Sequence, residues 1–206
     1  MTRIFLLSPA QTNGPRAQML HNPHADFDLA RRLREPTGAP LGEVFSFLSA
    51  LYFRGKLAYA LRFASPIGAR PAVFVITPGF GLCPPEEAID LERLRAFATV
   101  PIASTETRYL QPLRRDAEAL AARAPSPAEI VLLGSVASAK YVDPLCAVFG
   151  ERLVFPSDFV GRGDMSRGGL LLRAADGGTE LACVPVQGAV RRGSRPPRLA
   201  PRKRPR

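Results

Sequence analysis

The chain of 206 residues has no tryptophan, three cysteines and two histidines. Cys83, Cys146 and Cys183 are far apart and form no Cys-x-x-Cys pair, so we expect neither a disulfide framework nor a zinc knuckle. His21 and His24 are separated by a proline that disfavours a helix, and no third ligand is adjacent, so they do not predict a metal site. Free cysteines of this kind favour a reducing, cytoplasmic setting.

Long apolar runs are also missing from the sequence. No window holds about eighteen consecutive apolar residues, so we expect no membrane span. The apolar run at residues 4–7 is too short for a signal-peptide core. Hydrophobic residues nevertheless make up 46% of the chain, which is enough for the core of one domain of ordinary size. The oligomeric state is left open.

The formal net charge of +10 is concentrated at the end of the chain. From Arg191 onward there are eight Lys or Arg residues and no acidic residue. Removing these eight from the 28 basic residues leaves 20 against 18 acidic ones, a net charge of about +2 for the body. We therefore predict a folded body at residues 1–187 and a basic, Pro- and Arg-rich tail at residues 188–206 that is disordered, because it has almost no apolar content to bury.

Apolar runs alternate with helical periodicity along the body. The strands contain few polar interruptions, which is typical of parallel sheets covered on both faces. This order favours a single three-layer α/β/α domain with a mostly parallel sheet of about four to five strands. The expected strands are residues 3–8, 71–77, 129–134, 152–156 and 180–186, and the expected helices are residues 25–34, 41–64, 86–97, 108–123, 135–149 and 165–175.

A loop dense in Gly, Arg, Asp and Ser within residues 154–173 is the strongest candidate site. If a helix begins near Met165, with Asp164 or Ser166 as its cap, its free N–H groups favour an anion. Glycine has no side chain, so its backbone can lie close to a ligand, and arginine can form bidentate hydrogen bonds to phosphate or carboxylate. The predicted anion-binding residues of this loop, residues 158–169, are Arg162, Gly163, Ser166, Arg167 and Gly168.

Two carboxylates of the same loop are candidate catalytic groups. Asp164 or Asp158 would act as general acid or base if it lies within hydrogen-bond reach of a substrate proton. The two could also share a Mg²⁺ ion with a substrate phosphate, because magnesium often uses one or two protein carboxylates. Nothing in their spacing demands a metal, and no cofactor is evident.

Polar residues elsewhere are further candidates for the site. Ser8 and Gln11 follow the first strand, where α/β sheets gather ligands, although an ordinary surface loop would look the same. Ser135 and Lys140 follow another strand; they are either an activated nucleophile with its base or a helix cap with a solvated lysine. In the helix at residues 41–64, Gly55 marks a break or a close contact. The charged neighbours of that glycine, Arg54 and Lys56, either reach solvent or project toward the site.

Some of these segments resemble the uracil-DNA glycosylase superfamily. The strand and turn at residues 130–137 and the strand ending in Phe-Pro at residues 153–156 are similar to its Leu-Gly-x-x-Ala and Phe-Pro patterns. Residues 51–60 and 75–85 are similar to small bacterial domains grouped near that fold. The resemblance implies the fold. It does not imply base excision, because residues 158–164 contain no histidine and the acidic residue expected after the first strand is missing.

Three functions remain open from the sequence. The first is an enzyme of hydrolase or glycosylase type that processes a nucleotide, a nucleobase or a nucleic acid at residues 158–169. The second is a non-catalytic nucleic-acid-binding protein that uses the basic tail, since Lys and Arg bind phosphates with a strong salt dependence. The third is a structural domain in which Arg162–Asp164 and Arg167–Asp158 pairs merely stiffen a Gly-rich turn.

Overall fold

The first strand of the chain lies in the middle of a six-stranded sheet. The computed structural model describes residues 2–67 and 70–200. β1 pairs in parallel with β5 on one side and with β8 on the other, and β8 pairs in parallel with β9. The two edge strands, β6 and β10, run antiparallel to their neighbours. The strand order is β10 (Cys183–Pro185), β9 (Leu153–Pro156), β8 (Ala128–Leu133), β1 (Thr2–Leu7), β5 (Val73–Thr77), β6 (Gly81–Cys83).

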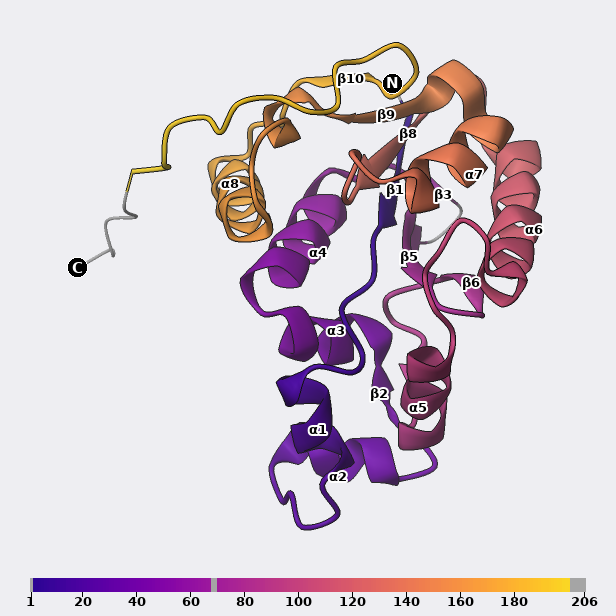
Figure 1. Cartoon of the computed structure of the whole chain (residues 1–206), viewed down its shortest axis with the longest axis vertical. Helices are drawn as coiled ribbons and strands as arrows, with labels where there is room; N and C mark the ends of the chain where they lie inside the picture. The colour runs from indigo at the N-terminus through magenta and orange to yellow at the C-terminus, as the bar shows by residue number, and fades with distance from the viewer. Residues whose placement is uncertain (1, 68–69, 201–206) are drawn as a thin grey trace.

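Helices cover both faces of this sheet. α4 (Leu51–Phe63) and α8 (Asp164–Gly177) lie to one side of the strands, and α6 (Thr107–Arg123) and α7 (Ala139–Phe149) lie to the other (Figure 1). The buried side chains of β1 and β8 form the centre of one continuous hydrophobic core. The predicted α/β domain with a mostly parallel sheet is therefore confirmed. Within the described ranges no helix is both long and apolar enough to cross a bilayer.

A group of short helices lies beyond the carboxyl ends of the parallel strands, in the lower part of Figure 1. β1 leads directly into this part of the molecule (Figure 1). The four helices are α1 (Pro15–His21), α2 (Asp28–Arg34), α3 (Leu41–Ser49) and α5 (Leu91–Thr99). Minor elements are the strand pairs β2 (Ala39–Pro40) with β7 (Ala88–Ile89) and β3 (Pro66–Ile67) with β4 (Arg70–Pro71), and the 3-10 turns η1 (Gly150–Arg152) and η2 (Ser157–Phe159).

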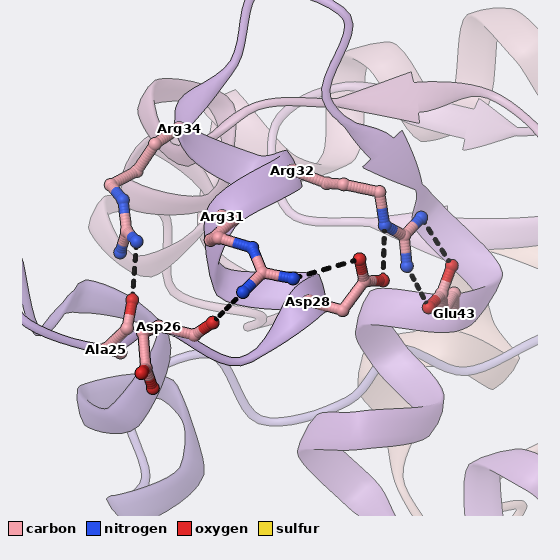
Figure 2. A network of polar contacts seen from close by, with 7 residues as sticks. All are labelled: Ala25, Asp26, Asp28, Arg31, Arg32, Arg34 and Glu43. Atoms are coloured by element: carbon pink, nitrogen blue, oxygen red, sulfur yellow. Dashed lines mark hydrogen bonds and ion pairs between the residues drawn. The ribbon is translucent and has the colours of Figure 1, made fainter.

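Arginines of α2 tie the short helices together (Figure 2). Arg32 pairs with Glu43 of α3 through both of its terminal nitrogens, and its Nε donates to Asp28 at 2.8 Å. Arg34 reaches back to main-chain carbonyls of Asn22 and Ala25. Exposed ion pairs of this kind add little to stability, because solvent screens the charges. They orient the helices, while the core supplies the stability.

Several predicted boundaries were wrong. The helix expected at residues 41–64 is two helices, α3 and α4, because Ala50 adopts a left-handed φ of 47°. α8 begins at Asp164 with Gly163 as its N-cap, and no side chain caps it. α7 begins at Ala139, so Ser135 is not its cap. Two elements lie outside the strands and helices expected from the sequence: β6, within residues 78–85, and α1.

The basic tail has no regular secondary structure over residues 187–200, and part of it lies against α8. The Nη1 atom of Arg162 donates to the carbonyl of Pro197 at 3.3 Å, and Arg173 donates to the carbonyl of Ala200. The remaining part of the predicted tail, residues 201–206, lies outside the described residues.

Gly55 and Gly168 allow α4 and α8 to meet backbone to backbone. A Cβ atom at Gly55 would lie 2.5 Å from the carbonyl oxygen of Gly168. A Cβ atom at Gly168 would lie 2.7 Å from the carbonyl oxygen of Leu51 and 2.8 Å from the Cα atom of Tyr52. Gly55 therefore marks a close contact and not a break.

We expect Gly168→Ala to destabilise the protein by about 1–3 kcal/mol, because the added methyl group has only rigid backbone to displace. Gly169→Ala is the matched control on the same helix. Its Cβ atom would meet only the end of the Leu199 side chain at 3.5 Å, and alanine favours helix. The free energy of unfolding in urea measures both changes. Equal effects of the two substitutions would contradict the close contact.

Candidate functional site

A cavity of about 720 Å³ lies between the carboxyl ends of the parallel strands and the short helices. Its walls come from the segment after β1, the ends of α3 and α5, the start of α7 and the first residue of α8. The lining residues are mostly polar or aromatic at its centre. Those used below are Ser8, Gln11, Asn13, Tyr52, Phe97, Ala98, Ser135, Lys140, Tyr141 and Asp164.

Ser8 and Lys56 form a buried polar pair at the floor of this cavity. Ser8 directly follows β1, and Lys56 comes from α4, 48 positions later. The Lys56 Nζ atom donates to the main-chain carbonyl of Ser8, and it lies 2.9 Å from Ser8 Oγ. Only 1% of Lys56 is exposed. Ser8 is among the residues that line the cavity and Lys56 is not.

The surroundings of Lys56 disfavour its charged form. Nζ lies 4.5 Å from the ring centroid of Tyr52 and 4.9 Å from that of Phe53, so aromatic faces replace water around the amine. Burial lowers the pKa of Lys56 to about 7, although the carboxylate of Asp164 acts in the opposite direction. Near neutral pH a substantial fraction of this amine is therefore uncharged and able to accept a proton.

Tyr52 brings a buried hydroxyl to the same wall. Burial raises the pKa of Tyr52 to about 12; Asp164 raises it further and Arg167 opposes the rise. The Tyr52 hydroxyl oxygen makes no hydrogen bond of normal geometry with any described residue, even though the Arg167 guanidinium lies near it. Across the cavity, burial raises the pKa of Tyr141 as well. Both phenols therefore stay protonated at neutral pH, as potential donors to a ligand.

The structure divides the predicted site residues into three groups. Five of them line the cavity: Ser8, Gln11, Ser135, Lys140 and Asp164. Three others, Arg162, Gly163 and Ser166, line a second cavity of about 390 Å³ on the far side of the loop. The four that line neither are Asp158, Arg167, Gly168 and Arg54.

These four residues have other surroundings. Asp158 is exposed, and its carbonyl accepts a bond from Arg162 Nε at 3.0 Å. Arg167 is buried and donates to the carbonyl of Phe159 through Nε and Nη2 at 3.2 and 3.0 Å. Gly168 serves the helix contact described above, and Arg54 lies on an exposed face of α4. The guanidinium of Arg167 thus holds the loop in place rather than facing an open anion site.

The ion pairs expected within the loop have different partners. Arg167 pairs with Asp164 at 3.6 Å, three positions earlier on α8. Arg162 bonds to main-chain oxygens and to the hydroxyl of Ser166 at 3.3 Å. The exposed carboxylate of Asp164 therefore lines the main cavity, and its ion-pair partner Arg167 does not.

The second cavity is rich in arginine. Two arginines come from the loop and α8, and two come from the tail segment that lies against them. No acidic residue is among the described residues that line it. Its arginines are Arg162, Arg173, Arg195 and Arg198.

Three side chains of the main site were not predicted as site residues. Lys56 was considered as one of two charged residues in an apolar helix that needed an explanation, and that misfit was the available signal. Tyr52 and Tyr141 looked like ordinary core residues, because nothing in their local sequence distinguishes them from the other buried tyrosines. Within residues 2–67 and 70–200, no cluster of His, Cys, Asp or Glu is suited to hold a metal ion.

Comparisons with models of protein families, with curated proteins and with solved structures found no match to this chain. Function therefore has to be inferred from the chemistry of the cavity, because a fold alone supports many functions.

The buried amine makes a prediction about stability. The folded pKa of Lys56, about 7, lies below the ordinary value of 10.5, so between these values the unfolded chain binds more protons than the folded one. The contribution of Lys56 to the free energy of unfolding therefore rises with pH between these two pKa values. Relative to Lys56→Met, we expect the free energy of unfolding of the natural protein to rise by up to about 1.4 kcal/mol per pH unit between pH 7 and 9.

Arg54→Met, on the exposed face of the same helix, is the control. Arginine keeps its charge throughout this range, so its difference from the natural protein should stay constant with pH. Urea unfolding at several pH values measures both differences. A constant difference for Lys56→Met as well would show that the amine remains charged in the folded state.

Proposed function

We propose that this protein is an enzyme whose substrate is a nucleoside or a nucleobase-like heterocycle bound in the main cavity. The observation that carries the proposal is the convergence of reactive and ring-binding groups at the carboxyl ends of β1, β5 and β8, where open α/β sheets place their ligands. The volume of about 720 Å³ lies within the range of small-molecule sites.

The cavity combines aromatic surfaces with hydrogen-bonding groups. Tyr52, Phe97 and Tyr141 offer rings for a flat heterocycle to pack against. Gln11 and Asn13 supply amides, linked to each other by a bond of 2.9 Å. Pockets that bind a nucleobase use this combination: aromatic or apolar side chains stack on the faces of the base, and polar groups form hydrogen bonds with its edges.

The charges favour an uncharged ligand over one with several phosphates. Lys140 and Asp164 are the one cation and the one carboxylate among the described lining residues, so the cavity carries little net charge. The low net charge of the cavity therefore favours nucleosides and free bases over nucleotides as substrates. Asp164 is the candidate general acid or base, because its carboxylate lies at the rim where a substrate would arrive.

Nucleosides and free bases should raise the melting temperature as their concentration rises. At a hundred times its Kd a ligand adds about 2.7 kcal/mol, or roughly 5–10 °C for a chain of this size. A ligand that stabilises the protein is then incubated with it, and chromatography follows its conversion. Asp164→Asn should slow conversion by about a hundredfold or more if the carboxylate transfers a proton.

The occluding variant Ala98→Trp tests the location. Ala98 is exposed at the end of α5 and lines the cavity, so an indole there fills the space without disturbing the core. It should remove the thermal shift, whereas Arg54→Met should keep it. Ribose 5-phosphate serves as the charged comparison. A stronger shift with ribose 5-phosphate than with any nucleoside or base would contradict the proposed ligand class.

A second function is favoured by the arginine-rich cavity. Four arginines from α8, its preceding loop and the tail converge there with no acidic residue among the described lining residues, which suits the phosphate backbone of a nucleic acid. We propose that this surface binds single- or double-stranded nucleic acid without sequence preference, since the tail carries no aromatic residue for base stacking.

Removing residues 188–206 should abolish binding to a labelled oligonucleotide. In the full chain, Arg195→Gln with Arg198→Gln should weaken binding and lower the slope of log K against log salt by about 0.7–0.9 per lost phosphate contact. Fluorescence anisotropy at several salt concentrations measures this slope. The exposed Arg31→Gln on α2 is the control. A truncated body that binds as well as the full chain would rule out this function.

A further inference from the structure

The bonded hydroxyl and amine of the main cavity are not the pair that the chain order suggests. Ser135 and Lys140 lie near each other in sequence, but it is Ser8 that contacts a lysine, Lys56, through Oγ and Nζ at 2.9 Å. Ser8 lines the cavity, and Lys56, which is 1% exposed, contacts the Ser8 hydroxyl directly next to that lining. Gly134 makes room for this arrangement, because a Cβ atom there would lie 2.9 Å from the Cβ atom of Ser8.

A structural role alone would not require this arrangement. A lysine that only held the end of β1 would need its bond to the carbonyl of Ser8, and it would be most stable with the ammonium partly hydrated. Here the amine is enclosed by aromatic rings. Nζ is placed as the donor to both the carbonyl and the hydroxyl of Ser8. When the amine is neutral, the same 2.9 Å contact lets its lone pair accept the hydroxyl proton.

We propose that Ser8 is a nucleophile that attacks the ester carbonyl of an acylated nucleoside or heterocycle in the cavity, and that Lys56 accepts the hydroxyl proton. The inference rests on the proposed function in one respect, namely that the main cavity is the substrate site. It adds the reaction class, acyl transfer to water, and the reacting atom. A hydroxyl activated by an adjacent base is the general form of such a site, and lysine serves as the base in known variants.

The steps balance without any further reactant than water. In the first step a bond forms between Ser8 Oγ and the acyl carbon, the proton passes from Oγ to Lys56 Nζ, and the ester C–O bond breaks. The leaving alcohol takes its proton from the Lys56 ammonium. In the second step water attacks the acyl-serine, Lys56 takes a proton from the water, and the bond to Ser8 Oγ breaks. That proton returns to Oγ, and the net products are a carboxylic acid and an alcohol.

The charge of the site favours an acyl carbon over phosphorus. A phosphoryl transition state spreads negative charge over several oxygens and needs several cations, whereas Lys140 is the one cation among the described residues that line the cavity. The titratable groups around Lys56 are Tyr52 on its own helix, Asp164 and Arg167 on α8, and Tyr141 on α7. Of these, the carboxylate of Asp164 is the group that stabilises the ammonium formed in the first step.

A fluorophosphonate probe tests the nucleophile directly. Such a probe traps an activated serine, because Oγ displaces fluoride from phosphorus and the protein gains a fixed mass. We expect intact-protein mass spectrometry to show one adduct, and peptide mapping to place it on Ser8. Ser8→Ala should abolish labelling, and Lys56→Met should slow it by about a hundredfold or more at pH 7.5. Ser104→Ala, an exposed serine outside the cavity, should label normally.

The pH profile distinguishes a base from a merely structural lysine. Labelling of the natural protein should rise with pH and level off above a midpoint near 7, and Lys56→Met should lack this midpoint. An adduct on Ser135, or equal labelling of Ser8→Ala, would overturn the proposal. If Lys56→Met does not fold, the comparison of Ser8→Ala with Ser104→Ala still decides it. A nucleoside-dependent thermal shift that persists in Ser8→Ala while labelling is lost separates this inference from the proposed function.

Discussion

The backbone contact between α4 and α8 is the constraint on which the cavity depends. Gly55 and Gly168 bring the two helices closer than side chains at either position would allow. Tyr52 and Lys56 lie within one turn of Gly55, and Asp164 lies one turn before Gly168, so the same contact sets the distances among these three groups. Helices packed through larger residues lie about 8–10 Å apart. A wider spacing would withdraw the amine from Ser8 and the carboxylate from the rim.

Burying the amine of Lys56 costs desolvation free energy, and the fold does not require an amine at this position. An apolar side chain of similar length would fill the same space without the penalty of desolvating an amine, and the carbonyl at the end of β1 could be satisfied by water entering from the cavity. The protein instead keeps a polar pair in a place where burial lowers the proton affinity of the amine. Perturbed ionisable groups beside a cavity are a physical mark of function, because a structural element gains little from them.

The layered fold could be predicted from the sequence because β1, β5 and β8 are continuous apolar runs, each of which ends at a turn. β10 lies at an edge of the sheet, a position that suits Pro185 because proline cannot donate to a neighbouring strand. The break at Ala50 could not be predicted, since alanine normally favours helix and its left-handed conformation is imposed by packing. The site was predicted in part. Ser8 was named from its place after β1, but its bond to Lys56 joins residues 48 positions apart and no local pattern reports it.

The central place of β1 has a consequence for how the protein is made. β1 leaves the ribosome well before its partner β8, because the paired residues Arg3 and Glu129 are 126 positions apart. At about 5–20 residues per second, translation leaves that edge of the strand uncovered for roughly 6–25 seconds. Four consecutive apolar side chains of β1 are fully buried in the folded protein. In the nascent chain these side chains stay exposed until the neighbouring strands have been synthesised.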